Sequence, residues 1–143
     1  MTVNHNDILG TARRLSVSSD VDGAPCESDL RSVASRAYYA SFHAALDAIP
    51  DALQPSKEQH RGRNSHQVVI DAVVIWGKSN RPGRTEARIV ARNLAQLKGV
   101  RKKADYFTNE DFTSHEALNA LHLAAKTIAS AALAAEQTRR QVS

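Results

Sequence analysis

The sequence has little of what loop-rich or cross-linked proteins depend on. Among 143 residues there are one cysteine, four prolines and six glycines, and aromatic residues make up only 5%. A single cysteine, Cys26, cannot form an internal disulfide, so a disulfide-stapled domain is excluded and a reducing compartment is expected. The shortage of glycine and proline, together with abundant alanine, favours an all-α protein.

Targeting and membrane signals are also missing from the sequence. Residues 1–6 carry neither a basic segment nor an apolar run, so no signal peptide is expected. No apolar stretch approaches the length of a membrane span by inspection of the sequence. The expected location is therefore the cytoplasm, with no membrane partner.

The chain is long enough for one domain with a real core. Apolar residues make up 42% and charged residues 24% of the 143 residues, which is ordinary for a globular protein. The sequence shows no internal repeat and no second domain. We expect a single helical domain over residues 1–143, with its core in about 4–137 and a frayed tail at 138–143.

Apolar periodicity predicts five helices in an up-and-down antiparallel bundle. Capping boxes are expected where Asn64 precedes Gln67 and where Thr113 precedes Glu116. The proline-punctuated segment 50–62 is predicted to be a mobile loop, and 77–83 a turn. The predicted helices are 4–16, 27–49, the segment following Asn64 through Trp76, 84–107, and 113–137.

Positive charge is concentrated in one part of the chain. The net charge is +4, but nine basic residues and only one acidic residue lie between Lys78 and Lys103. Such a segment could bind the phosphates of RNA, or it could be a solvated basic face. The candidate phosphate-binding residues are Arg84, Arg88, Arg92, Lys98, Lys102 and Lys103, with Arg61 and Arg63 on the loop before the third helix.

Two helical segments carry residues that a purely structural helix does not need. In 35–45, Arg36, Tyr39 and His43 project from one side, while Tyr38 and Phe42 fall on the apolar side. In the predicted fourth helix, Arg101 falls within the apolar arc and Asp105 follows at i+4. A guanidinium on a core-facing arc needs a partner or a functional use.

These two segments together resemble the HEPN-domain family. Ser35-Arg36-Ala37-Tyr38-Tyr39-Ala40-Ser41-Phe42-His43-Ala44-Ala45 resembles its second-helix signature. Leu97-Lys98-Gly99-Val100-Arg101-Lys102-Lys103-Ala104-Asp105-Tyr106 resembles the Arg-x-x-Ala-Asp-Tyr signature of its small stand-alone branch. His66 stands where that branch often carries a histidine, and the similarity covers roughly 29–133.

The resemblance implies an α-bundle, commonly a homodimer, tied to RNA cleavage, toxin–antitoxin pairs and antiviral defence. It also implies a possible nucleotidyltransferase-fold or antitoxin partner. Ribonuclease members carry an arginine followed four to six residues later by histidine, and the arginine maps to Arg101. The position five residues on is Tyr106, which departs from the pattern because a phenol titrates near 10 rather than near neutral pH. Arg61 and His66 fit the spacing, but they precede the third helix.

In a metal-independent ribonuclease, Arg101 could stabilise the phosphate oxyanion, and His43 or His66 could act as general base or acid. Tyr39 or Tyr106 could orient the phosphate. The structural alternative is an ion pair of Asp105 with either Arg101 or Arg36, with Tyr39 and His43 as hydrogen-bonded residues at the edge of the core.

The scattered histidines include no helical His-x3-His pair and predict no metal site, and no cofactor is expected. Two other functions remain open from the sequence. The chain could be a non-catalytic interaction module for a nucleotidyltransferase or antitoxin protein, or a nucleotide-binding domain that uses the basic residues.

Overall fold

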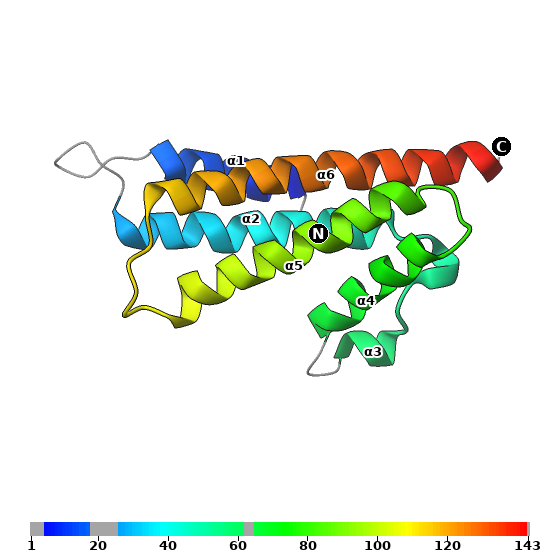
Figure 1. Ribbon diagram of the computed structural model, residues 1–143, viewed down its shortest axis with the longest axis horizontal. Helices are drawn as coiled ribbons and strands as arrows, with labels where there is room; N and C mark the ends of the chain where they lie inside the picture. The colour runs from blue at the N-terminus through cyan, green and yellow to red at the C-terminus, as the bar shows by residue number, and fades with distance from the viewer. Residues whose placement is uncertain (1–4, 18–25, 62–64, 143) are drawn as a thin grey trace.

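The computed structural model describes residues 5–17, 26–61 and 65–142, and all regular structure in these ranges is helical. The predicted all-α bundle is confirmed, but the described ranges contain six α-helices rather than five (Figure 1). The elements are α1 (His5–Val17), α2 (Glu27–Ala48), the 3₁₀ helix η1 (Asp51–Leu53), α3 (Lys57–Arg61), α4 (Ser65–Lys78), α5 (Arg84–Tyr106) and α6 (Ser114–Val142).

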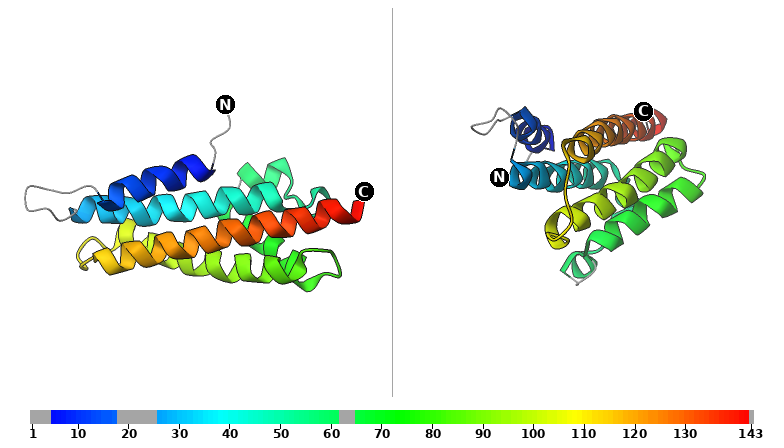
Figure 2. Two further views of the ribbon diagram at one scale, coloured as in Figure 1. Left: turned by 90° about the horizontal axis from the view of Figure 1, so that it is seen from above. Right: turned by 60° about the vertical axis from the view of Figure 1, so that its left-hand side comes forward.

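Helix α2 lies at the centre of the bundle and packs against α1, α4, α5 and α6 (Figure 2). A helix surrounded in this way needs small side chains on nearly every side, so that its neighbours can approach closely. Ala40, which projects from the polar side together with Tyr39, is in fact fully buried. The buried alanines of α2 are Ala34, Ala37, Ala40, Ala44, Ala45 and Ala48.

The segment expected to be a loop contains the additional helix α3. Its start is fixed by a capping box that the sequence reading overlooked. The backbone N–H of Ser56 donates to Gln59 Oε1 at 2.8 Å, and the N–H of Gln59 donates to Ser56 Oγ at 3.2 Å. The predicted cap at Asn64 lies outside the described residues.

The connection between α4 and α5 is short and tightly bonded. The indole of Trp76 donates to the carbonyl of Pro82 at 2.9 Å, and Arg88 Nε donates to the carbonyl of Gly77 at 2.7 Å. Gly83 has a φ of 82°, and a Cβ there would lie 2.7 Å from the carbonyl oxygen of Ala134. Both the positive φ and the close approach of α6 therefore require glycine at this position.

The predicted capping box at the start of α6 is confirmed. The N–H of Glu116 donates to Thr113 Oγ1 at 3.2 Å, and the N–H of Thr113 donates to Glu116 Oε1 at 3.4 Å. The expectation that 138–143 frays is wrong for its described part, because α6 continues to Val142. An i,i+4 ion pair between Arg140 and Glu136, at 2.7 Å, supports this last turn.

Helix α6 is long enough and apolar enough to cross a membrane by length and composition, because an 18-residue window within Ser114–Gln141 reaches a mean hydropathy of 1.2. This corrects the expectation that no stretch approaches that length. Alanine is its most frequent apolar residue, and the helix packs along α2 and α5 as part of the bundle. Its contacts are therefore those of a bundle helix.

Candidate functional site

Two aromatic residues of α2 and a histidine of α4 stack together where these helices meet. The ring of His66 lies 4.4 Å from the ring of Phe42, with an interplanar angle of 19°. The hydroxyl of Tyr38 is 3.0 Å from His66 Nδ1, and the Tyr38 side chain is fully buried. Burial of Tyr38 and its hydrogen bond together fix the orientation of the imidazole.

Helix α5 adds a guanidinium to these rings. The Cζ atom of Arg101 lies 5.7 Å from the ring centre of Tyr38 and 5.2 Å from that of Tyr39. Arg101 Nε also donates to Asp105 Oδ2 at 3.1 Å, which is one of the two pairings that the sequence left open for Asp105. We call Tyr38, Tyr39, Phe42, His66 and Arg101 the Arg101 cluster.

The expectation that Arg101 lies toward the core is confirmed, because only 18% of its side chain is exposed. Two aromatic rings and one carboxylate partly replace the water that the guanidinium loses. The hydrogen bond to Asp105 uses Nε, and no described residue accepts a hydrogen bond from the terminal nitrogens. These nitrogens are therefore available to an anionic ligand.

A series of hydrogen-bonded polar side chains extends from the cluster along α4. Lys98 Nζ donates to Gln67 Oε1 at 3.0 Å, and Gln67 Nε2 donates to Asp71 Oδ1 at 2.8 Å. This places the ammonium of Lys98 on the same side of α5 as Arg101. A second cation therefore lies beside the cluster.

These surroundings alter the titration of two cluster residues. Burial lowers the pKa of His66 below its usual value of 6.5, and the nearby charges of Arg101, Lys98 and His43 lower it further. Burial raises the pKa of Tyr38 to about 12. At neutral pH the imidazole is therefore neutral and the phenol is protonated.

A neutral imidazole can accept a proton, which an imidazolium cannot. The Tyr38 hydroxyl can rotate to donate to His66 Nδ1 or to accept from it, so either tautomer of the ring keeps this hydrogen bond. When Nδ1 carries the proton, Nε2 has a free lone pair. The cluster can thus bind an anion at Arg101 and accept a proton at His66.

The structure brings together part of the predicted catalytic set. His66, Tyr39, Arg101 and Asp105 meet at the cluster, and the ring of His43 lies 5.7 Å from that of Phe42.

Two other members of the predicted set lie elsewhere. Tyr106 is 67% exposed near the end of α5. Arg36 is exposed on α2, and among the described residues Asp105 is paired with Arg101 rather than with Arg36.

The basic residues of α5 do not form one continuous surface. Arg88 is bonded to the end of α4, and Lys103 forms an ion pair with Glu116 of α6 at 2.8 Å. Arg84 donates to Asn80 at 3.5 Å. Each of these three cations therefore binds a carbonyl, a carboxylate or an amide of the protein itself. These partners lie on different sides of α5.

The remaining predicted phosphate-binding residues are dispersed. Lys102 is exposed, while Arg92 lines a groove on the side of α5 that faces α6. Among the predicted phosphate-binding residues that the structure describes, Lys98 alone lies beside the Arg101 cluster. The side chains of Arg61 and Arg63 lie outside the described part of the structure.

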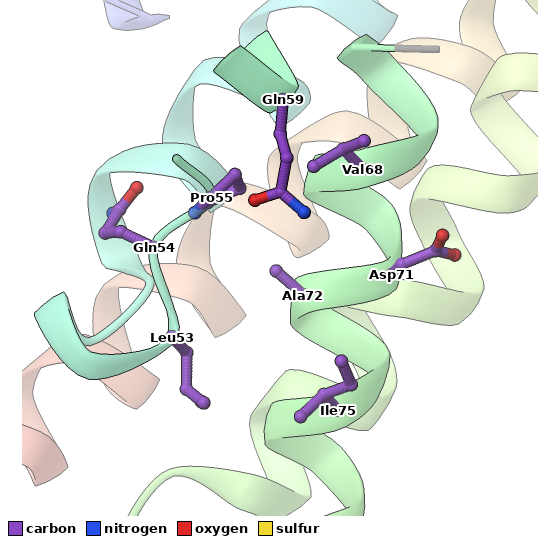
Figure 3. Close-up of a pocket in the computed structure, with 8 residues that line it drawn as sticks. All are labelled: Leu53, Gln54, Pro55, Gln59, Val68, Asp71, Ala72 and Ile75. Atoms are coloured by element: carbon purple, nitrogen blue, oxygen red, sulfur yellow. The ribbon is translucent and has the colours of Figure 1, made fainter. Parts of the chain in front are cut away.

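A separate small pocket of about 180 Å³ lies between η1, the segment that follows it, α3 and α4 (Figure 3). Leu53, Val68, Ala72 and Ile75 provide its apolar lining. The carboxylate of Asp71 points to the far side of α4 in this view and accepts the hydrogen bond from Gln67. The pocket therefore has no converging set of reactive groups.

The described residues contain no group of three His, Cys, Asp or Glu that could hold a metal ion.

Tyr38 was not predicted as a site residue, because helical projection places it on the apolar side of its helix. A buried tyrosine needs a hydrogen-bond partner, and that requirement is a signal that could have directed attention to His66.

Comparisons with family models, with curated proteins and with solved structures gave no match to this chain.

Proposed function

We propose that the chain is a HEPN-like, RNA-directed protein whose Arg101 cluster binds and cleaves a phosphodiester without a metal ion. The observation that carries this proposal is the meeting of an oriented guanidinium with a hydrogen-bonded, neutral imidazole. A cation for the phosphate and a base for the ribose hydroxyl are the two groups that such a reaction requires.

In the proposed reaction, the terminal nitrogens of Arg101 bind the non-bridging oxygens of the phosphate. His66 takes the proton of the 2′-hydroxyl, and the 2′-oxygen forms a bond to phosphorus. The bond from phosphorus to the 5′-oxygen breaks, and His43 acts as the general acid that gives a proton to that oxygen. The products are a 2′,3′-cyclic phosphate and a 5′-hydroxyl, and Arg101 balances the charge that develops on the phosphorane.

The position of Tyr106 favours a second candidate function, RNA binding with slow cleavage. Because Tyr106 is 67% exposed near the end of α5, it does not supply a group to the cluster within one copy of the chain. A relative that retains RNA binding but cleaves slowly is the second candidate. A homodimer, a cytoplasmic location and a nucleotidyltransferase-fold or antitoxin partner belong to the same proposal.

The deciding experiment incubates the purified chain with total RNA and a tRNA pool in EDTA. Wild type is compared with Arg101→Ala, His66→Ala and His43→Ala, and Arg14→Ala serves as the control because Arg14 is an exposed arginine of α1. We expect cleavage by wild type and Arg14→Ala, a loss of about 100-fold or more in Arg101→Ala and His66→Ala, and 2′,3′-cyclic phosphate ends.

The folding of each variant is checked by far-ultraviolet circular dichroism. Intact RNA with every protein would refute the nuclease, and a gel-shift assay with the same tRNA pool would then test the RNA-binding candidate. Cleavage that survives Arg101→Ala in full would show that another site, or a contaminating nuclease, is responsible.

A further inference from the structure

Lys98 lies beside the Arg101 cluster with a charge that no carboxylate contacts directly. Its Nζ donates to the neutral amide oxygen of Gln67 at 3.0 Å, and it forms no ion pair with a described residue. The Nζ of Lys103, by contrast, lies 2.8 Å from a carboxylate oxygen of Glu116. Because an ammonium has three donors, Lys98 keeps two donors and its positive charge for a ligand.

Two polar residues of α4 determine where this ammonium lies. Gln67 Nε2 donates to Asp71 Oδ1 at 2.8 Å, which leaves Oε1 of the same amide to accept from Lys98. Gln67 and Asp71 are exposed, so these hydrogen bonds contribute little to the stability of the bundle. Their main effect is to hold a long, flexible side chain in one place, which reduces the entropy that it loses when a ligand binds.

The two cations of the site are held toward different helices. Lys98 and Arg101 are an i,i+3 pair on α5, so their Cβ atoms lie about 5–6 Å apart. From there the guanidinium of Arg101 extends over the ring of Tyr39 on α2, whereas the ammonium of Lys98 is bonded to Gln67 on α4. Two cations held apart in this way fit two neighbouring anionic groups better than one. Successive phosphates of an RNA strand, each with one negative charge, are such a pair.

Both cations act on the imidazole that serves as the proposed base. Burial has the largest effect in lowering the pKa of His66, and the positive charges of Arg101 and then Lys98 lower it further. The first turn of α4, which carries His66 and Gln67, contains no acidic residue that would repel a phosphate. A strand whose reacting phosphate is bound at Arg101 therefore has its next phosphate within reach of Lys98.

We infer that Lys98 binds the phosphate next to the reacting one, so that the site selects RNA strands with two or more phosphates over a dinucleotide with one. Gln67 and Asp71 act as positioning residues for Lys98. This inference rests on the part of the proposed function in which Arg101 binds the reacting phosphate. The neighbouring phosphate lies on either the 5′ or the 3′ side, and these two cases require different ligands in the test.

The test measures dissociation constants for the full chain by amide NMR titration. Three 2′-deoxy dinucleotides with the same two bases are compared: one with the internal phosphate alone, one with an added 5′-phosphate and one with an added 3′-phosphate. None can be cleaved by the proposed reaction, because each lacks the attacking hydroxyl. We expect the added phosphate on one side to tighten binding about tenfold, with new shifts at Lys98 and Gln67.

Variants of the protein connect this preference to Lys98. Lys98→Met should remove the tenfold preference and leave the affinity for the one-phosphate ligand unchanged, whereas Lys98→Arg should keep most of the preference. Gln67→Met should reduce it to about threefold with an unchanged melting temperature. The matched control is Lys78→Met, because Lys78 is an exposed lysine at the other end of α4, about 18 Å along the helix from His66.

Cleavage of the corresponding ribonucleotides gives a second readout. The ratio of kcat/KM between the favoured two-phosphate substrate and the one-phosphate substrate should be about ten in wild type and about one in Lys98→Met. Removing the charge of Lys98 also changes the pKa of His66, but this change affects both substrates equally and cancels in the ratio.

Several outcomes would overturn the inference. Equal affinity of the wild type for all three ligands would show that there is no second phosphate site. Equal weakening of all three in Lys98→Met would show that Lys98 and Arg101 bind the same phosphate. A preference that persists in Lys98→Met, or that falls equally in Lys78→Met, would place its origin elsewhere. Intact RNA in EDTA would refute the proposed nuclease instead, since the binding test needs no cleavage.

Discussion

Replacing Arg31 should strongly destabilise the fold, although Arg31 lies away from the Arg101 cluster. Arg31 belongs to α2, only 12% of its side chain is exposed, and Nη1 donates to the carbonyls of Lys103 and Ala104 at 3.1 and 2.9 Å. The same guanidinium donates to the carbonyl of Phe107 at 3.4 Å and to that of Glu110. The carbonyls of Lys103 and Phe107 also accept the backbone N–H groups of Phe107 and Glu110, whereas those of Ala104 and Glu110 have no such second donor among the described residues.

The expected loss of stability on replacing Arg31 follows from this set of contacts. A hydrogen bond from a charged donor contributes about 1.5–3 kcal/mol, but bonds that share one guanidinium are not additive. The carbonyls at the end of α5 can partly recover water, which reduces the loss. We therefore expect Arg31→Met, which keeps the apolar stem, to lower the free energy of unfolding by about 3 kcal/mol.

Urea unfolding followed by circular dichroism measures this loss. Arg31→Lys should lose slightly less stability than Arg31→Met, because its ammonium can still reach some, but only some, of the carbonyls. Arg14→Met is the control, since Arg14 is exposed and donates only to Thr11 within its own helix. A loss below about 1 kcal/mol in Arg31→Met would show that the carbonyls are satisfied equally well by solvent, and the reasoning would be refuted.

Three further predictions concern single residues. Proton NMR should place the pKa of His66 below 6.5, and Arg101→Met should raise it by removing a positive charge. Since unfolded His66 binds protons more readily, stability should fall as pH drops below 6.5. Gly83→Ala should destabilise by about 2 kcal/mol or more in thermal unfolding, while Gly99→Ala, which meets no obstacle, should be neutral or stabilising. Thr113→Ala should cost about 1 kcal/mol through loss of the α6 cap, measured by urea unfolding.

Much of the helical framework could be read from local sequence signals. The ends of α2 and α5 lie within a residue or two of their predicted positions, because Pro50 and the turn before Gly83 stop helices locally. The missed helix α3 shows the limit of this approach. It has only five residues and no apolar periodicity, so its capping box was the one available signal.

The candidate site was predicted in its components but not in its arrangement. Periodicity placed Arg101 on the apolar arc and Asp105 one turn later, and both features are present. The pairing of His66 with Tyr38 joins residues 28 positions apart, and no spacing rule could have selected it. The concentration of basic residues in α5 did not show which neighbouring helix or turn each long side chain reaches.

The sequence by itself determined that this chain forms a helical bundle, because helix propensity and apolar periodicity are properties of neighbouring residues. Only the tertiary structure decided which polar groups meet. The stacking of His66 on Phe42 and the position of Arg101 over two tyrosine rings both depend on how α2, α4 and α5 pack. Packing between helices is set by the whole core at once, so these contacts appear only when the chain is folded.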